Sequence, residues 1–133
     1  MNGADFLEVA KRLENSPSEA ERRTSIGRSY YALYNVLVTL LSSQGVFFHR
    51  QGRDHRLLLS YLVKADHAEA SLIAKTLRDL RTARNDADYR MDVFVVAESS
   101  LLACWLARTE VDRLNALSPA EREAMVRSIK GLS

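Results

Sequence analysis

Cysteine, proline and glycine are all scarce in this chain of 133 residues, and each scarcity argues against a particular kind of fold or site. The single cysteine, Cys104, rules out a disulfide within the chain and argues against a cysteine-based zinc site. Five glycines and two prolines supply few β-turn positions, which disfavours an all-β fold. The length fits one domain and leaves no room for separate catalytic and binding domains.

Long hydrophobic runs and an excess of one charge are also missing. No apolar run reaches the roughly 18 residues that cross a bilayer, and the first segment lacks the apolar stretch of a signal peptide. We therefore expect a cytoplasmic protein with no membrane partner. Lys and Arg number 19 against 17 Asp and Glu, so the net charge of +2 neither predicts nor excludes nucleic acid binding. A hydrophobic content of 47% is typical of a globular chain.

What the sequence does contain is helical periodicity. Apolar residues recur at spacings of three and four almost throughout, and no strand-like alternation competes with them. The spacing predicts helices over residues 4–13, 17–43, 55–64, 68–89, 93–117 and 120–129. The predicted fold class is all-α, an up-and-down bundle of four to five main helices that forms a single domain over residues 1–133.

Boundary signals support these helices. Ser16 before Pro17 and Ser118 before Pro119 each precede a glutamate, as in a capping box. The expected caps of the other helices are Asp54, Asp66 and Asp92, and the expected stops are Gly45 and Gly131. The predicted apolar stripes are Ile26, Tyr30, Leu33, Leu37 and Leu40 on one helix, and Val96, Leu101, Leu102, Trp105, Leu106 and Val111 on another.

The longest predicted helix also carries a polar stripe of Arg28, Tyr31 and Asn35. These residues either line a polar groove or form a subunit interface, where Tyr and Arg are enriched. The alternative, favoured for Tyr30 and Tyr34, is that the rings pack in the bundle and their hydroxyls form hydrogen bonds to a partner or to water.

A second polar feature is the arginine-rich segment of residues 80–90. Arg81, Asn85 and Asp88 share one helix face, and Arg84 can pair with Asp88 four residues on. A solvated face with weak ion pairs is the ordinary interpretation of such a helix. Here the apolar stripe of Ile73, Leu77, Leu80 and Ala87 places Arg84 at the edge of the core, where a guanidinium needs partners.

A third feature is basic and lies near the middle of the chain. It consists of His49, Arg50, Arg53, His55 and Arg56. Such a cluster is either a surface loop or a set of phosphate contacts. The histidine spacings do not fit a helical metal pair, so we expect no metal and no cofactor.

The segments ERRTSIGRSYYALYNVL and LRTARNDADYR together resemble the HEPN superfamily, over roughly residues 19–117. The resemblance implies a helical bundle that usually dimerises, and in many members a metal-independent endoribonuclease acting as a toxin or antiviral effector. It also implies that Arg84 is the family's catalytic arginine and Asn85 the polar residue that follows it. The family's histidine would fall at Tyr89, Arg90 or Met91, and none of these is histidine.

Three hypotheses follow. The leading one is a dimeric HEPN-type module that binds RNA or a nucleotide, with or without weak cleavage, beside a nucleotidyltransferase-like antitoxin in a toxin–antitoxin or defence system. The second is a metal-independent endoribonuclease with an altered Arg–Tyr pair, and the third is a non-catalytic helical adaptor. The candidate catalytic residues are Arg84, Asn85 and Tyr89, and the candidate ligand-binding residues are Arg28, Tyr31, Asn35, Arg81, Asp88 and His55.

Overall fold

A computed structural model describes residues 2–49 and 54–132, and within them the fold is all-α, as predicted. The helices are α1 (Gly3–Leu13), α2 (Glu19–Ser43), α3 (Asp54–Lys64), α4 (Ala68–Tyr89), α5 (Ala97–Ala116) and α6 (Pro119–Lys130). Arg50 and Arg53 of the basic cluster lie outside the described residues. None of the described helices is long and apolar enough to cross a membrane.

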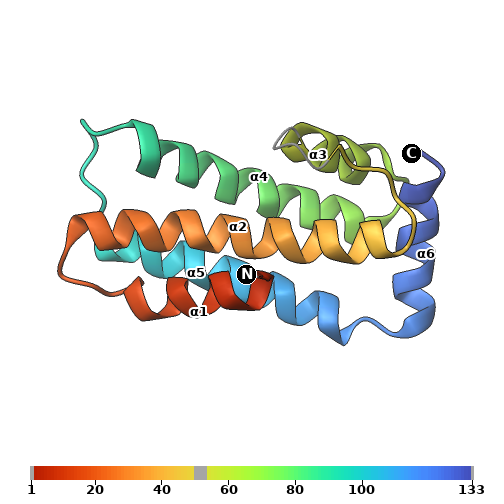
Figure 1. Cartoon of the computed structure of the whole chain (residues 1–133), viewed down its shortest axis with the longest axis horizontal. Helices are drawn as coiled ribbons and strands as arrows, with labels where there is room; N and C mark the ends of the chain where they lie inside the picture. The colour runs from red at the N-terminus through yellow and green to blue at the C-terminus, as the bar shows by residue number, and fades with distance from the viewer. Residues whose placement is uncertain (1, 50–53, 133) are drawn as a thin grey trace.

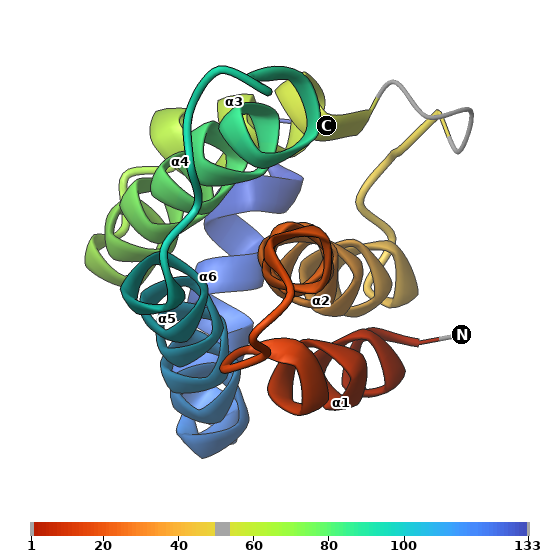
Figure 2. The ribbon, with the colours of Figure 1, turned by 90° about the vertical axis from the view of Figure 1, so that its left-hand side faces the viewer.

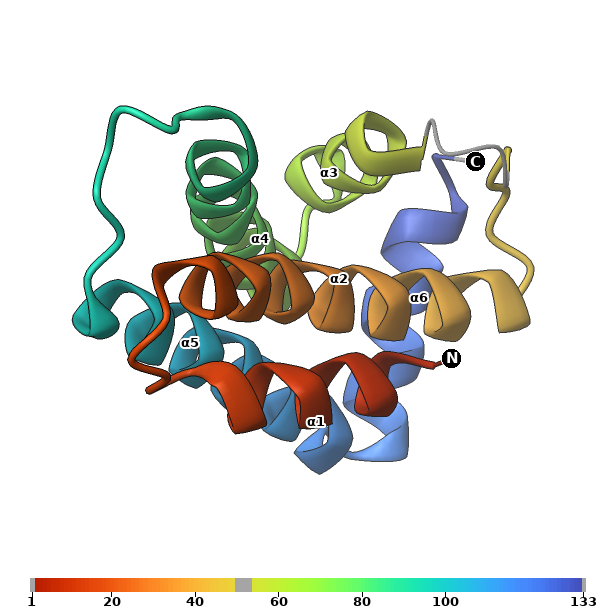
Figure 3. The ribbon, with the colours of Figure 1, turned by 60° about the vertical axis from the view of Figure 1, so that its left-hand side comes forward.

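The long helix α2 is the centre of the bundle, and it packs against α1, α4 and α5 (Figure 1). Viewed from the end, α1 lies below α2, and α4 and α5 lie on one side of it (Figure 2). The shorter helix α3 lies beside α4, and α6 crosses the end of the bundle (Figure 3). The result is compatible with an up-and-down bundle.

The core follows the predicted stripes of α2 and α4. Ile26, Tyr30, Leu33 and Leu37 are fully buried, whereas Leu40 is only half-buried and Leu41 takes the next core position. The α4 stripe of Ile73, Leu77, Leu80 and Ala87 is buried as predicted. Cys104 is buried as well, and burial raises the pKa of its thiol to about 12, which keeps it protonated.

The apolar stripe predicted for the fifth helix is wrong in part. Val96, Leu101, Leu102 and Trp105 are exposed. The face of α5 that meets the bundle includes the smaller Ala103, Cys104 and Ala107. Small side chains allow α5 to lie close to α2. Periodicity ranked the large apolar residues first and therefore chose the wrong face.

Two helix starts also differ from the prediction. Ser18, not Ser16, caps α2, because its hydroxyl oxygen accepts from the Glu21 backbone N–H at 3.3 Å. Ser16 instead donates to the Glu21 carboxylate at 2.6 Å. The helix α5 begins at Ala97 after Val96, so Asp92 is not its cap.

Of the other predicted helix ends, the structure confirms some and not others. Asp54 is the first residue of α3, and its carboxylate accepts from the His49 backbone N–H at 2.7 Å. His67, not Asp66, precedes α4. The capping box of Ser118 is confirmed, and Gly45 ends α2 with a left-handed φ of 91° that glycine adopts without strain.

Candidate functional site

A cleft of about 890 Å³ lies between α1, α2, α3 and α4. Four of the nine candidate site residues line it, although the sequence separates them widely. Its lining residues are Phe6, Tyr31, Tyr34, Asn35, Val38, Thr39, Ser42, Asp54, His55 and Arg84. We call it the Arg84 cleft.

The helix α2 supplies one long wall of the Arg84 cleft. Tyr31, Tyr34, Asn35, Val38 and Ser42 are spaced by three or four residues, so they share one helix face. This face lies next to the core stripe of α2 and remains only partly covered. Two residues of the predicted polar stripe, Tyr31 and Asn35, therefore line a groove, whereas Arg28 does not line it.

Arg84 forms one end of the cleft and is held by three side chains. Its terminal nitrogens donate to the Tyr31 hydroxyl at 2.8 Å and to the Asn85 side-chain oxygen at 3.0 Å. Its Nε lies 3.0 Å from an Asp88 carboxylate oxygen, which confirms the predicted ion pair. The side chain is 19% exposed, so this guanidinium is partly desolvated and still reachable.

His55 approaches the same cleft from the start of α3. Its Nδ1 and the Tyr30 hydroxyl oxygen lie 2.5 Å apart, in hydrogen-bonding contact. Its ring stacks on Tyr34 with 4.3 Å between centroids. Two hydrogen bonds hold α3 to the segment before it. The Asp54 carboxylate accepts from the His49 backbone N–H, and the Tyr61 hydroxyl donates to the Phe47 carbonyl at 2.9 Å.

The electrostatic surroundings keep His55 neutral. Burial lowers the pKa of its imidazole, and the charges of Arg81 and Arg84 lower it further, while Asp54 opposes them. Burial raises the pKa of the Tyr30 and Tyr34 hydroxyls, so both phenols keep their protons near neutrality.

Two further arginines, Arg28 and Arg81, lie near the cleft. Arg28 lies with its guanidinium carbon 5.4 Å from the Phe6 ring centroid and lines a small adjoining pocket with Tyr31 and Asp88. Arg81 is half-buried, and its charge acts on Tyr30 and His55. Within the described part of the chain, neither guanidinium forms an ion pair or a hydrogen bond to an acid.

Tyr89 is one of the candidates that do not line the cleft. It is 70% exposed at the end of α4, and its ring centroid lies 5.8 Å from the Arg84 guanidinium carbon. Asn85 does not line the cleft either, but it holds Arg84 in place. The sequence analysis did not assign six of the lining residues to this site: Phe6, Tyr34, Val38, Thr39, Ser42 and Asp54. Four of these six lie on α2.

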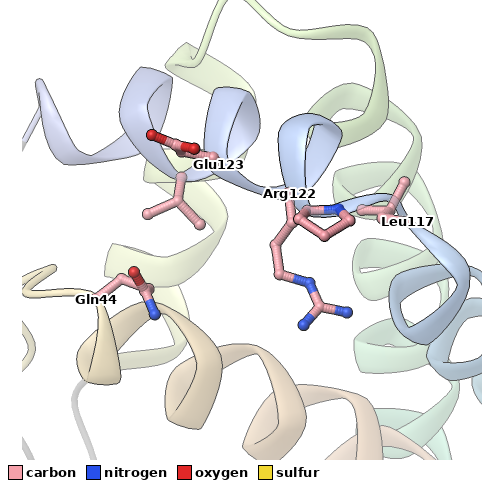
Figure 4. A pocket seen from close by; sticks show the side chains of 6 residues that line it. Gln44, Leu117, Arg122 and Glu123 are labelled. Atoms are coloured by element: carbon pink, nitrogen blue, oxygen red, sulfur yellow. The ribbon is translucent and has the colours of Figure 1, made fainter.

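A second pocket, of about 440 Å³, lies where α2 ends near α6 (Figure 4). It is lined by Gln44, Leu117, Pro119, Arg122, Glu123 and Val126. Arg122 donates there to the Leu114 carbonyl at 3.0 Å, which ties α6 to the end of α5. This pocket contains none of the candidate site residues, and Arg122 has a structural role there.

Two proteins of the archaeon Methanocaldococcus jannaschii are similar in sequence. The uncharacterized protein MJ0992 is 30% identical over 109 residues, which cover 68% of this chain and 62% of that protein. The uncharacterized protein MJ0628 is 28% identical over 107 residues, which cover 68% of this chain and 64% of that protein. The chain thus matches slightly less than two thirds of each relative's length. No family model matches the chain, and no solved structure matches it.

Proposed function

We propose that this chain is a dimeric HEPN-type module that binds RNA or a nucleotide in the Arg84 cleft. The observation that carries the proposal is the convergence of Arg84, Tyr31 and His55, from three different helices, on one cleft. Arginine forms paired hydrogen bonds to phosphate oxygens, and aromatic rings stack on unpaired bases. The cleft offers both kinds of group side by side.

The charge around the cleft supports an anionic ligand. Arg28 and Arg81 border it without an acid partner among the described residues, and a half-buried guanidinium in that situation favours a bound anion. Asn35 donates its amide to the Tyr31 carbonyl at 2.8 Å, which leaves its side-chain oxygen for a base edge or a ribose hydroxyl.

The biological setting of the proposal comes from the resemblance to HEPN proteins. It comprises a homodimer, a nucleotidyltransferase-like antitoxin partner and a role in a toxin–antitoxin or defence system, whereas the cytoplasm as compartment is proposed from the sequence alone. Light scattering on the purified chain tests the first element, and a mass that corresponds to one copy would contradict it.

Binding of fluorescently labelled single-stranded RNA of mixed sequence tests the function. We expect Arg84→Ala to weaken binding about tenfold or more, because it removes a partly desolvated charged donor. Arg78→Ala is the matched control, since Arg78 is exposed on the same helix and does not line the cleft. Equal binding by wild type and Arg84→Ala, or no binding by either, would favour the adaptor hypothesis.

A further inference from the structure

The outer face of α5 carries large apolar side chains that the described part of the chain leaves uncovered. Leu101, Leu102 and Trp105 are spaced by three and four residues from one another, so they share one helix face. Their exposed fractions are 38%, 56% and 53%. The small residues of the opposite face pack on the bundle, and no described helix lies against the left-hand side of α5 in Figure 2. A single copy therefore leaves this apolar face in water.

The size of the apolar surface fits an interface. Phe94 and Val96 are exposed directly before α5 and add to the area beside its first turn. Together with the three side chains on the helix they present roughly 500 Å² of apolar surface, near the upper end of what a monomer leaves exposed. A stable pair of proteins buries about 800 Å² on each partner, of which about 60% is apolar, and this is the same amount.

Two opposite charges on the same side of α5 have no partner among the described residues. Glu98 is exposed one turn before Leu102, and Arg108 is half-buried one turn after Trp105. Neither of the two forms an ion pair or a hydrogen bond with a described residue, and the buried Nε of Arg108 has no acceptor. An acid at one end of the apolar face and a base at the other can each be satisfied by a group from outside the chain.

We propose that a second copy of this chain packs on this face of α5, with the two helices antiparallel and related by a two-fold axis. If Leu101 of one copy meets Trp105 of the other, Glu98 of the first is level with Arg108 of the second, because both pairs of positions are centred on residue 103. The symmetry forms each contact twice. A parallel pair would instead bring like charges together at both ends, so the charges favour the antiparallel arrangement.

The inference rests on the homodimer proposed above, to which it assigns a surface. No residue of α5 lines the Arg84 cleft. Pairing through α5 therefore leaves the cleft of each copy open, and the dimer binds two RNA strands, one in each cleft.

The fluorescence of the wild-type chain tests the surface without any substitution. The chain contains one tryptophan, so tryptophan emission reports on Trp105 alone. On dilution, we expect the mass from sedimentation to fall from two copies to one. The emission maximum should move to longer wavelength with the same midpoint, because Trp105 returns to water. A dimer that dissociates with no change in emission would overturn the assignment.

A charge in the middle of the apolar face should separate the two copies. We expect Leu102→Glu to raise the dissociation constant of the dimer about 30-fold or more, because it places a carboxylate at the centre of the contact. Val63→Glu is the matched control, since Val63 is 50% exposed on α3. The control should leave the mass unchanged, and both variants should keep the helical content of the wild type.

Charge exchange tests the antiparallel register. Glu98→Arg alone and Arg108→Glu alone each place like charges opposite one another, so each variant should associate more weakly than the wild type. An equal mixture of the two variants should associate again, because both contacts of the mixed dimer then join opposite charges. A mixture that associates no better than the separate variants overturns the register.

The outcomes separate this inference from the proposed function. Wild type with the mass of one copy at every concentration overturns both the α5 surface and the homodimer. A dimer that persists in Leu102→Glu overturns the α5 surface and leaves the homodimer standing. A dimer that Leu102→Glu separates, but that binds no RNA, supports the surface and contradicts the binding function.

Discussion

Three charged side chains at the start of α2 hold the segment that joins α4 to α5. Arg23 donates to the Asp86, Ala87, Arg90 and Val93 carbonyls, which lie at and beyond the C-terminal end of α4. Arg22 donates to the Val95 carbonyl at 2.9 Å, and Glu19 accepts from the Val95 N–H at 2.7 Å. These contacts hold Val95 in the segment before α5, which begins at Ala97.

We predict that Arg23→Ala lowers the free energy of unfolding by about 2 kcal/mol, because it leaves several carbonyls with fewer donors. Urea unfolding measures the change. Arg12→Ala is the control, since Arg12 is exposed on α1. A loss for Arg23→Ala no larger than that of the control would contradict this role.

The neutral state of His55 predicts how stability depends on pH. Its pKa is lower in the folded chain than in the unfolded chain, so the unfolded chain binds the proton first as the pH falls. The contribution of His55 is complete above about 6.5 and is lost as the pH falls from there through the folded pKa. Unfolding free energies measured between about pH 7 and about pH 5 should therefore fall more steeply for wild type than for His55→Gln. Parallel curves would contradict the shift.

At the scale of the helices, Gly3 of α1 and Gly27 of α2 should respond in opposite ways to substitution by alanine. A Cβ on Gly3 would lie 2.4 Å from Val36 Cγ2 and 2.8 Å from the Ala32 carbonyl oxygen. A Cβ on Gly27 would meet only an Asp88 oxygen at 4.0 Å. The first substitution forces the helices apart, whereas the second adds helix propensity without a clash.

We expect Gly27→Ala to stabilise the chain by about 0.5–1 kcal/mol, and Gly3→Ala to destabilise it despite the better propensity of alanine. Thermal or urea unfolding of the two variants checks the signs. A stabilising Gly3→Ala would mean that α1 does not approach α2 as closely as described.

The helices themselves could be predicted because each has a periodic apolar stripe, and α2 and α4 bury the residues that the stripe predicts. The buried face of α5 could not be predicted in this way, since it depends on which side chains are small enough for close packing against α2. The start of α5 also depends on Glu19 and Arg22, which lie far away in the sequence. Helix ends are set by such tertiary contacts as much as by local capping residues.

At the scale of the whole molecule, the Arg84 cleft was predictable only in part. Arg84, Tyr31 and Asn35 lie on helices whose stripes place them near the core, and their convergence follows from the bundle. His55 and Phe6 lie in the cleft because of the way α3 and α1 pack on the bundle, and periodicity does not specify this packing. Tyr89 was placed by its position in a motif, and the structure leaves it exposed beyond the cleft.

The near balance of charges predicts a modest dependence of RNA binding on salt. With a net charge of only +2, attraction must come from the few arginines at the cleft. Each phosphate contact to single-stranded nucleic acid contributes about 0.7 to the slope of log affinity against log salt concentration. We expect Arg84→Ala to reduce the slope by about that amount and Arg78→Ala to leave it unchanged. Equal slopes in all three proteins would exclude a phosphate contact at Arg84.

The most direct measurement of the central claim is a map of where RNA contacts the chain. Backbone amide chemical shifts recorded during titration with single-stranded RNA should change most at Tyr31, Asn35, His55 and Arg84, which line one cleft from three helices. Little change is expected along α6 and around Arg122. Shifts confined to α6, or spread evenly over the surface, would contradict the assignment of the Arg84 cleft as the binding site.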